Sequence, residues 1–213
     1  VLEMPAIPGV EFIQGDFNDE SVLGQLNALL GGARVDLVMS DMAPNMTGIA
    51  DVDHDRSMQL VELAEEFLDR LAPYGLRRTS MFPVYGLAEA SLAVSFPQPG
   101  MLYRCITVDR RSLGVGSPAR HVDAADPTAL KLMCEGKPIP YTRVKLLDDA
   151  GMEVPAGTVG HLLMQGDNVT RGYFQNPEAN SAAVTADGWL RTGDLALEHG
   201  GNLYVTGRSK EII

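Results

Sequence analysis

Three groups of residues in this 213-residue sequence have the types and spacing to do chemistry. In the first group, Tyr85 directly precedes Gly86 and stands four residues before Glu89. An aromatic ring can stack on a purine, a glycine lets a phosphate approach the backbone, and a carboxylate can bind Mg²⁺. This group predicts a site for a nucleotide and a metal ion, although a Tyr-Gly pair more often serves packing.

The other two groups lie near the end of the sequence. Asp194 follows the glycine of a Thr-Gly-Asp sequence, where a carboxylate can accept hydrogen bonds from two ribose hydroxyls. Arg208 and Lys210 supply fixed positive charge that suits a phosphate or a ribose. The alternative readings are an ordinary turn at Asp194 and two solvated cations.

Two more acids, Asp16 and Asp41, follow predicted strands in the first third of the chain. At the carboxyl end of a parallel strand, a carboxylate can bind an adenine amino group or orient a nucleophile. The alternative is that each acid caps the next turn.

The elements that must position these acids alternate between strand and helix. The pattern predicts a strand over 10–16, a helix that begins after Asn18 or Asp19 and ends at Gly31-Gly32, a buried strand over 35–40 and a helix over 56–71. This order predicts an α/β fold with part of a doubly wound parallel sheet, which is Rossmann-like.

The remaining two thirds of the sequence have a different pattern. Residues 81–92 read as a strand, a tight turn and a helix start. Short strands are predicted near 103–109, 142–147, 159–164, 195–198 and 202–206. Many short strands at this spacing predict a small antiparallel β-barrel or sandwich subdomain.

The first third resembles a known enzyme family. Gln14-Gly15-Asp16-Phe17 and the ten residues 39–48 closely resemble the FtsJ-type ribosomal-RNA uridine 2′-O-methyltransferases, which use S-adenosylmethionine. The resemblance implies that Asp16 contacts the adenine end of the methyl donor. It implies that Asp41 lines the donor pocket and is the acid of a catalytic Lys-Asp-Lys-Glu set.

Residues 74–213 resemble a different family, the fatty-acyl-AMP ligases of the adenylate-forming (AMP-binding) superfamily. Four ordered motifs carry the resemblance, at residues 85–90, 166–178, 187–194 and 207–211. The resemblance implies that Tyr85 stacks on adenine with Gly86 beside it, Glu89 helps bind Mg²⁺, and Asp194 holds the ribose hydroxyls of ATP or AMP. It places Arg208 near the ribose or phosphate and Lys210 at the hinge before a mobile lid.

Each resemblance is incomplete. The methyltransferase glycine-rich loop and its other three catalytic residues have no counterpart in this sequence, and neither do the ligase phosphate loop and the lid lysine. Without groups that lower the barrier, we expect no turnover from this chain alone. The favoured function is a fragment of an ATP-dependent fatty-acid adenylating enzyme. The alternatives are a fragment of the rRNA methyltransferase or a non-catalytic chimera of the two.

Charge supports a boundary between two units. Residues 1–75 hold 14 acidic and 3 basic side chains, whereas residues 76–213 hold 14 of each. We expect a methyltransferase-like segment at 1–73, the end of a nucleotide-binding subdomain at 74–100, a β-rich subdomain at 101–206 and the start of a hinge at 207–213.

Composition excludes several classes of protein. The formal net charge of −11 argues against a self-sufficient nucleic-acid binder, so RNA is expected only under the methyltransferase reading. No run of residues has the length and apolarity of a membrane span, and we expect a cytoplasmic location. Cys105 and Cys134 are predicted to be reduced thiols. Open sheet edges predict a homodimer or a swapped partner.

Overall fold

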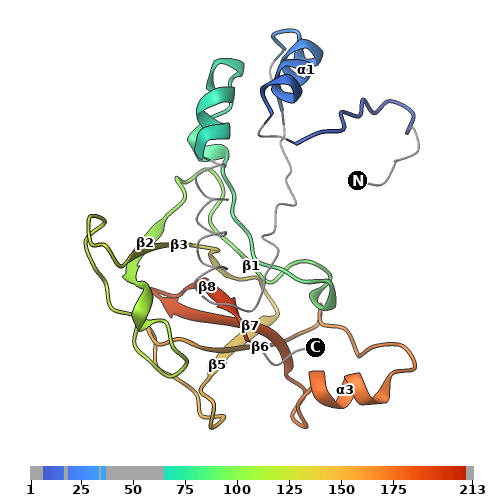
Figure 1. The fold of residues 1–213 in the computed structure, drawn as a ribbon. Coiled ribbons are helices and arrows are strands. Elements are labelled where there is room, and N and C mark those ends of the chain that lie inside the picture. The colour runs from blue at the N-terminus through green and yellow to red at the C-terminus, as the bar shows by residue number, and fades with distance from the viewer. Residues whose placement is uncertain (1–6, 17–18, 34, 37–64, 210–213) are drawn as a thin grey trace.

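The computed structural model describes residues 7–16, 19–33, 35–36 and 65–209. The first helix is where the sequence predicts it, as α1 (Glu20–Leu30), shown in blue in Figure 1. The Asp19 side chain accepts the Ser21 N–H, and Gly31 ends the helix in the left-handed conformation with φ 54°. None of the α1 residues is buried, so the apolar face of this helix is not part of a hydrophobic core.

The strand predicted over 10–16 is wrong, because these residues form a turn and coil. Val10 and Phe12 are each 52% exposed, and neither belongs to a sheet of the described chain. An extended segment without a hydrogen-bonded neighbour is not a stable strand. The strand predicted over 35–40 and the first part of the helix predicted over 56–71 lie mostly outside the described residues.

The second helix ends as predicted, just before Pro73. Residues 65–71 are helical, and a 3-10 turn follows over Ala72–Tyr74. Leu68 and Leu71 are each 4% exposed. The helix is tied to later segments by the Tyr103 hydroxyl, which donates to Glu65 at 2.5 Å, and by an ion pair of 2.8 Å between Arg78 and Asp69.

The β-rich part contains three antiparallel sheets, which do not close into a barrel in the described chain (Figure 1). The largest has the order β5-β6-β7-β8. Its strands are β5 (Thr142–Leu147), β6 (Gly160–Gly166), β7 (Leu190–His199) and β8 (Asn202–Arg208). The two smaller sheets pair β1 (Ser95–Phe96) with β4 (Lys137–Pro138) and β2 (Cys105–Asp109) with β3 (Ala129–Met133).

The four-stranded sheet packs against apolar side chains on both faces. Successive residues on a strand point to opposite sides, so neighbouring residues enter different clusters. Ala196 and Leu203 belong to one apolar cluster, which includes Tyr85 and Val94. Their neighbours Leu197 and Tyr204 belong to a second cluster, which includes residues of β2 and β3. The strand registers confirm the predicted antiparallel pairing, but the strands of the described residues do not form the closed barrel that was one predicted option.

The other connections contain one short helix, α3 (Pro177–Ala183). The Asn176 side chain caps it, and Pro177 occupies its first turn. Residues 81–92 form coil with a 3-10 turn over Ala88–Ala90, so the strand predicted within them is limited to an isolated bridge between Tyr85 and Ser95. Both cysteines are free, as expected. No helix of the described chain is long and apolar enough to cross a membrane.

Candidate nucleotide site

Asp194 is the centre of the candidate site and is 9% exposed. The β7–β8 register places Arg208 opposite Asp194, and Arg208 Nε donates to Asp194 Oδ1 at 3.1 Å. The hydroxyl of Tyr85, 109 positions away in the sequence, donates to Asp194 Oδ2 at 2.5 Å. The structure therefore brings together three residues that the sequence singles out separately.

A bulge in β7 aims Asp194 at these partners. The sequence predicts a turn at Thr192-Gly193-Asp194, but these residues lie inside β7. Gly193 has φ 79°, and the register of β6 against β7 shifts beside it. The Asp194 N–H donates to the Thr192 hydroxyl at 3.1 Å, and that hydroxyl donates to the Leu162 carbonyl at 2.8 Å. A bulge re-aims a strand side chain in this way.

Burial, rather than its hydrogen bond, is the main reason that the Tyr85 phenol stays neutral. Burial raises the pKa of Tyr85 far above its usual value of 10.0, and the negative charge of Asp194 raises it further. Tyr85 is 9% exposed and packs in the same apolar cluster as Ala90 and Val94. Its hydroxyl therefore serves as a donor to Asp194.

Glu135 is a carboxyl group near this site that sequence reasoning missed. It follows β3, is partly buried, and accepts the Val205 N–H at 2.9 Å. Burial raises the pKa of Glu135 to about 8, and the negative charge of Asp194 also raises it. Its sequence signal is a single acid between the largely apolar residues 129–134, which Lys131 interrupts, and Gly136.

The loop that follows Tyr85 is sterically tight. A methyl group at Gly86 would lie 1.4 Å from the Leu92 carbonyl oxygen, so no larger residue fits without moving the loop. Ser91 and Leu92 have φ values of 51° and 71°, and they turn the chain back so that the Val94 N–H donates to the Tyr85 carbonyl. Gly86 is therefore required by the loop itself, whether or not a phosphate approaches it.

Glu89, the candidate metal ligand, lies on the same loop and is partly exposed. Its Oε1 accepts the Tyr173 hydroxyl at 2.7 Å, and its main-chain carbonyl accepts the Thr170 N–H at 2.7 Å. The hydrogen bond to Glu89 raises the pKa of Tyr173. No group of three or more His, Cys, Asp or Glu side chains that could hold a metal ion occurs in the described chain. A Mg²⁺ here would thus depend on Glu89, phosphate oxygens and water, which is a common arrangement for this ion.

Of the remaining candidates, only Asp16 is described, and it is not brought to this site. Asp16 is exposed in the turn before α1, where its carbonyl accepts the Asp19 N–H at 2.9 Å. Asp41 and Lys210 lie outside the described residues.

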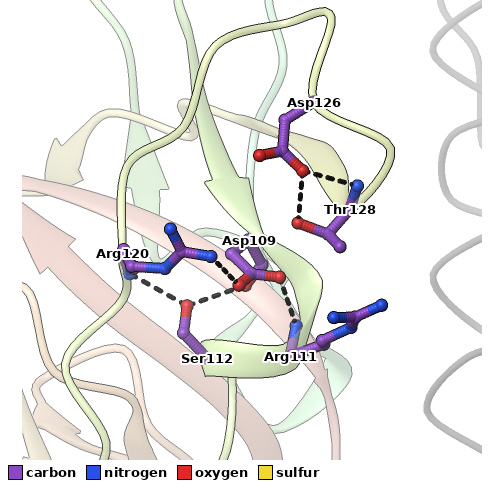
Figure 2. Close-up of polar contacts among 6 residues, drawn as sticks. All are labelled: Asp109, Arg111, Ser112, Arg120, Asp126 and Thr128. Carbon is purple, nitrogen blue, oxygen red and sulfur yellow. Dashed lines mark hydrogen bonds and ion pairs between the residues drawn. The ribbon is translucent and has the colours of Figure 1, made fainter.

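A separate polar cluster at the end of β2 is structural (Figure 2). Asp109 pairs with Arg120 and accepts the Arg111 N–H at 3.1 Å, which caps a 3-10 turn. The Ser112 hydroxyl donates to the Asp109 carbonyl and accepts the Arg120 N–H. The side-chain hydrogen bond from Arg120 and the main-chain N–H of Arg111 lower the pKa of Asp109 to about 2. These bonds hold the loop after β2 in place and leave the carboxylate little capacity for a ligand.

The contact of Tyr85, Asp194 and Arg208 joins three of the motifs that carry the resemblance to the adenylate-forming enzymes, and comparison with known families agrees with that resemblance. Residues 60–174 match the model of the AMP-binding enzyme family, and the chain belongs to that family. Residues 1–92 match the model of the FtsJ-like methyltransferases. The two matches overlap over residues 60–92, which include the boundary expected near residue 73.

Individual relatives show the same division. A 4-hydroxyphenylalkanoate adenylyltransferase of Mycobacterium marinum is 40% identical over 161 residues, which are 70% of this chain and 26% of the relative. Ribosomal RNA large subunit methyltransferase E of Methylobacillus flagellatus is 52% identical over 95 residues, which are 44% of this chain and 46% of that protein.

A solved structure supports the fold. The crystal structure of a fatty acid AMP ligase from Legionella pneumophila superposes with a TM-score of 0.62 and 29% identity, covering 80% of this chain and 28% of the ligase chain. The chain therefore spans between a quarter and a third of the length of the adenylating relatives compared here.

Proposed function

We propose that this chain carries part of the nucleotide site of an acyl-adenylating enzyme whose substrates are ATP and a fatty acid. The observation that supports this most strongly is the contact of Tyr85, Asp194 and Arg208, which come from three separate motifs and meet on one carboxylate. Relatives named as an adenylyltransferase and as a fatty acid AMP ligase support the same reaction class.

In this proposal, Asp194 binds the ribose. Its two oxygens now accept hydrogen bonds from Tyr85 and Arg208, and two ribose hydroxyls can take the same acceptor positions. The Arg208 side chain is 60% exposed, so it can turn from Asp194 toward a phosphate at little cost in packing. Because Tyr85 is 9% exposed, it contributes to the proposed site through its hydroxyl at Asp194 rather than through an open ring face for adenine, and the main chain at Gly86 approaches the phosphates.

The proposed reaction is attack of a fatty carboxylate oxygen on the α-phosphate of ATP. A new P–O bond forms, the bond to the β-phosphate oxygen breaks, and the products are acyl-AMP and pyrophosphate. Bound Mg²⁺ would neutralise charge on the phosphates, and Glu89 is the residue that would hold it. Arg208 would add a second positive charge for the phosphates.

Calorimetry with ATP and Mg²⁺ tests this proposal. We expect saturable binding by the wild type and its loss in Asp194→Asn, which keeps the size of the side chain but removes the charge. Asp149→Asn is a matched control, because Asp149 is 81% exposed and pairs only with His161 in the described chain. Absence of heat at millimolar ATP, or equal binding by Asp194→Asn, would contradict the proposal.

A second candidate function rests on the match of residues 1–92 to the methyltransferases. Under it, Asp16 and Asp41 bind S-adenosylmethionine, a doubly wound sheet includes the strand at 35–40, and the RNA partner is ribosomal. Binding of S-adenosylmethionine that disappears in Asp41→Ala would support this function, and failure to bind it would remove it.

We also propose that the two resemblances meet near residue 73, with the nucleotide-binding segment at 74–100, the β-rich subdomain at 101–206 and the hinge from 207. A homodimer is part of this proposal, since Phe82 and Leu102 remain 41% and 58% exposed. Light scattering after gel filtration tests it, and a monomer at high micromolar concentration would contradict it.

A further inference from the structure

Residues 86–93 form the loop that carries Glu89, here called the Glu89 loop. Hydrogen bonds join this loop to one later segment of the chain, residues 168–173. Asn168 Nδ2 donates to the carbonyls of Ala90 and Ala93, at 3.0 and 2.6 Å. The Ser91 hydroxyl donates to the Asn168 carbonyl at 3.2 Å. The two bonds from Asn168 satisfy carbonyls of a loop that has two residues at positive φ, and the Ser91 bond ties the same loop to the Asn168 main chain.

The Asn168 side chain is itself held from the four-stranded sheet. The Thr142 hydroxyl at the start of β5 donates to Asn168 Oδ1 at 2.8 Å. Gly166 at the end of β6 leaves room for this contact, since a methyl group there would lie 2.7 Å from Asn168 Oδ1. The sheet therefore fixes Asn168, and Asn168 fixes the loop.

Tyr173 reaches the Glu89 carboxylate from the other end of the segment. Its main-chain N–H donates to Asn180 Oδ1 at 2.5 Å, and Asn180 Nδ2 donates to its carbonyl at 3.0 Å, so α3 anchors it on both sides. With its backbone held, Tyr173 can donate from a fixed position to Glu89 Oε1 at 2.7 Å. This hydrogen bond constrains one oxygen of the Glu89 carboxylate.

We propose that Asn168 and Tyr173 are positioning residues for the nucleotide site: Asn168 sets the path of the loop, and Tyr173 sets the orientation of the Glu89 carboxylate toward the metal ion of Mg²⁺–ATP. This inference rests on the proposed adenylating function. Neither residue touches the nucleotide, and both act through the loop that carries Glu89.

The first test compares Tyr173→Phe, Glu89→Gln and the double variant by calorimetry, using ATP with Mg²⁺ and ATP with EDTA. Tyr173→Phe should weaken Mg²⁺–ATP binding about threefold to tenfold, as expected for one hydrogen bond, and leave metal-free ATP binding unchanged. In the Glu89→Gln background the Phe substitution should have no further effect, because its route to the ligand is gone. Tyr141→Phe, at a side chain 84% exposed, is the matched control.

The second test is amide hydrogen exchange of residues 90–95 in Asn168→Asp, which preserves shape but removes both donors to the Ala90 and Ala93 carbonyls. We expect about tenfold faster exchange there, with Asn202→Asp as a control, since Asn202 also donates to a backbone carbonyl, that of Gly200. Tyr173→Phe keeps the proposal testable if Asn168→Asp does not fold.

The outcomes separate the two proposals. Suppose that the wild type binds Mg²⁺–ATP through Glu89. If Tyr173→Phe then binds it with unchanged affinity, or if its effect adds to that of Glu89→Gln, the positioning role of Tyr173 is wrong and the adenylating function stands. If Asn168→Asp leaves exchange of the loop unchanged, the support by Asn168 is wrong. If the wild type binds no ATP, both proposals are overturned.

Discussion

Glu135 should make the stability of this protein fall as pH rises from 6 to 8. Its pKa is about 8 in the folded chain, against a usual value of 4.5, because the carboxyl is buried and lies near Asp194. The native state therefore holds this proton more tightly than the unfolded chain does. The stabilisation is complete below the unfolded pKa and is lost as pH rises through the folded one.

The size of the effect follows from the two pKa values. The free energy of unfolding falls by about 1.4 kcal/mol for each pH unit over which Glu135 is ionised in the unfolded chain and protonated in the native one. Between pH 6 and pH 8 this amounts to about 2 kcal/mol, since the slope decreases near the folded pKa. Glu135→Gln removes the ionisation and keeps an oxygen that can accept the Val205 N–H.

Urea denaturation at half-unit steps from pH 5.5 to 8.5 measures the effect as the difference in free energy of unfolding between variant and wild type, which cancels the contributions that the two proteins share. The free energy of unfolding of Glu135→Gln, taken relative to that of the wild type, should rise by about 2 kcal/mol between pH 6 and pH 8. Glu198→Gln is the control, because Glu198 is exposed and also accepts a backbone N–H, that of Gly201. Parallel pH profiles for Glu135→Gln and wild type would refute the reasoning.

Three further substitutions test the structure by urea denaturation. Tyr85→Phe removes a donor to a buried carboxylate and should lower the free energy of unfolding by about 2 kcal/mol; no change would mean that the bond to Asp194 is not formed. Gly86→Ala places a methyl group against the Leu92 carbonyl and should cost more than about 2 kcal/mol, so wild-type stability would contradict the loop path. Leu162→Ala, at a side chain 1% exposed, should cost about 3 kcal/mol, and a cost under about 1 kcal/mol would contradict its core position.

The β-rich part was largely predictable from the sequence, because apolar runs bounded by glycine turns are a local signal. The strands expected near 142–147, 159–164 and 202–206 correspond to β5, β6 and β8. The strand expected over 10–16 fails for a non-local reason, since a strand needs a partner and the described chain provides none there. Helix α3 was missed, although Asn176 followed by Pro177 is a recognisable helix start.

The candidate site was predictable in its members and not in its contacts. Tyr85, Asp194 and Arg208 stand out by residue type and motif, but the bulge that joins them depends on the register of β6 against β7. Glu135 could not be assigned to the site, because its partner Val205 is 70 positions away. The role of Asn168 was hidden in the same way, because the carbonyls it binds lie 75 and 78 positions earlier.

The central claim is that the nucleotide bound by this chain is ATP, held at Asp194. A side-by-side thermal unfolding experiment with ATP and Mg²⁺ or with S-adenosylmethionine tests it most directly, since a ligand that binds the native state must raise the melting temperature. We predict that ATP with Mg²⁺ raises the melting temperature of the wild type and has no effect on Asp194→Asn. A rise with S-adenosylmethionine and none with ATP would contradict the claim.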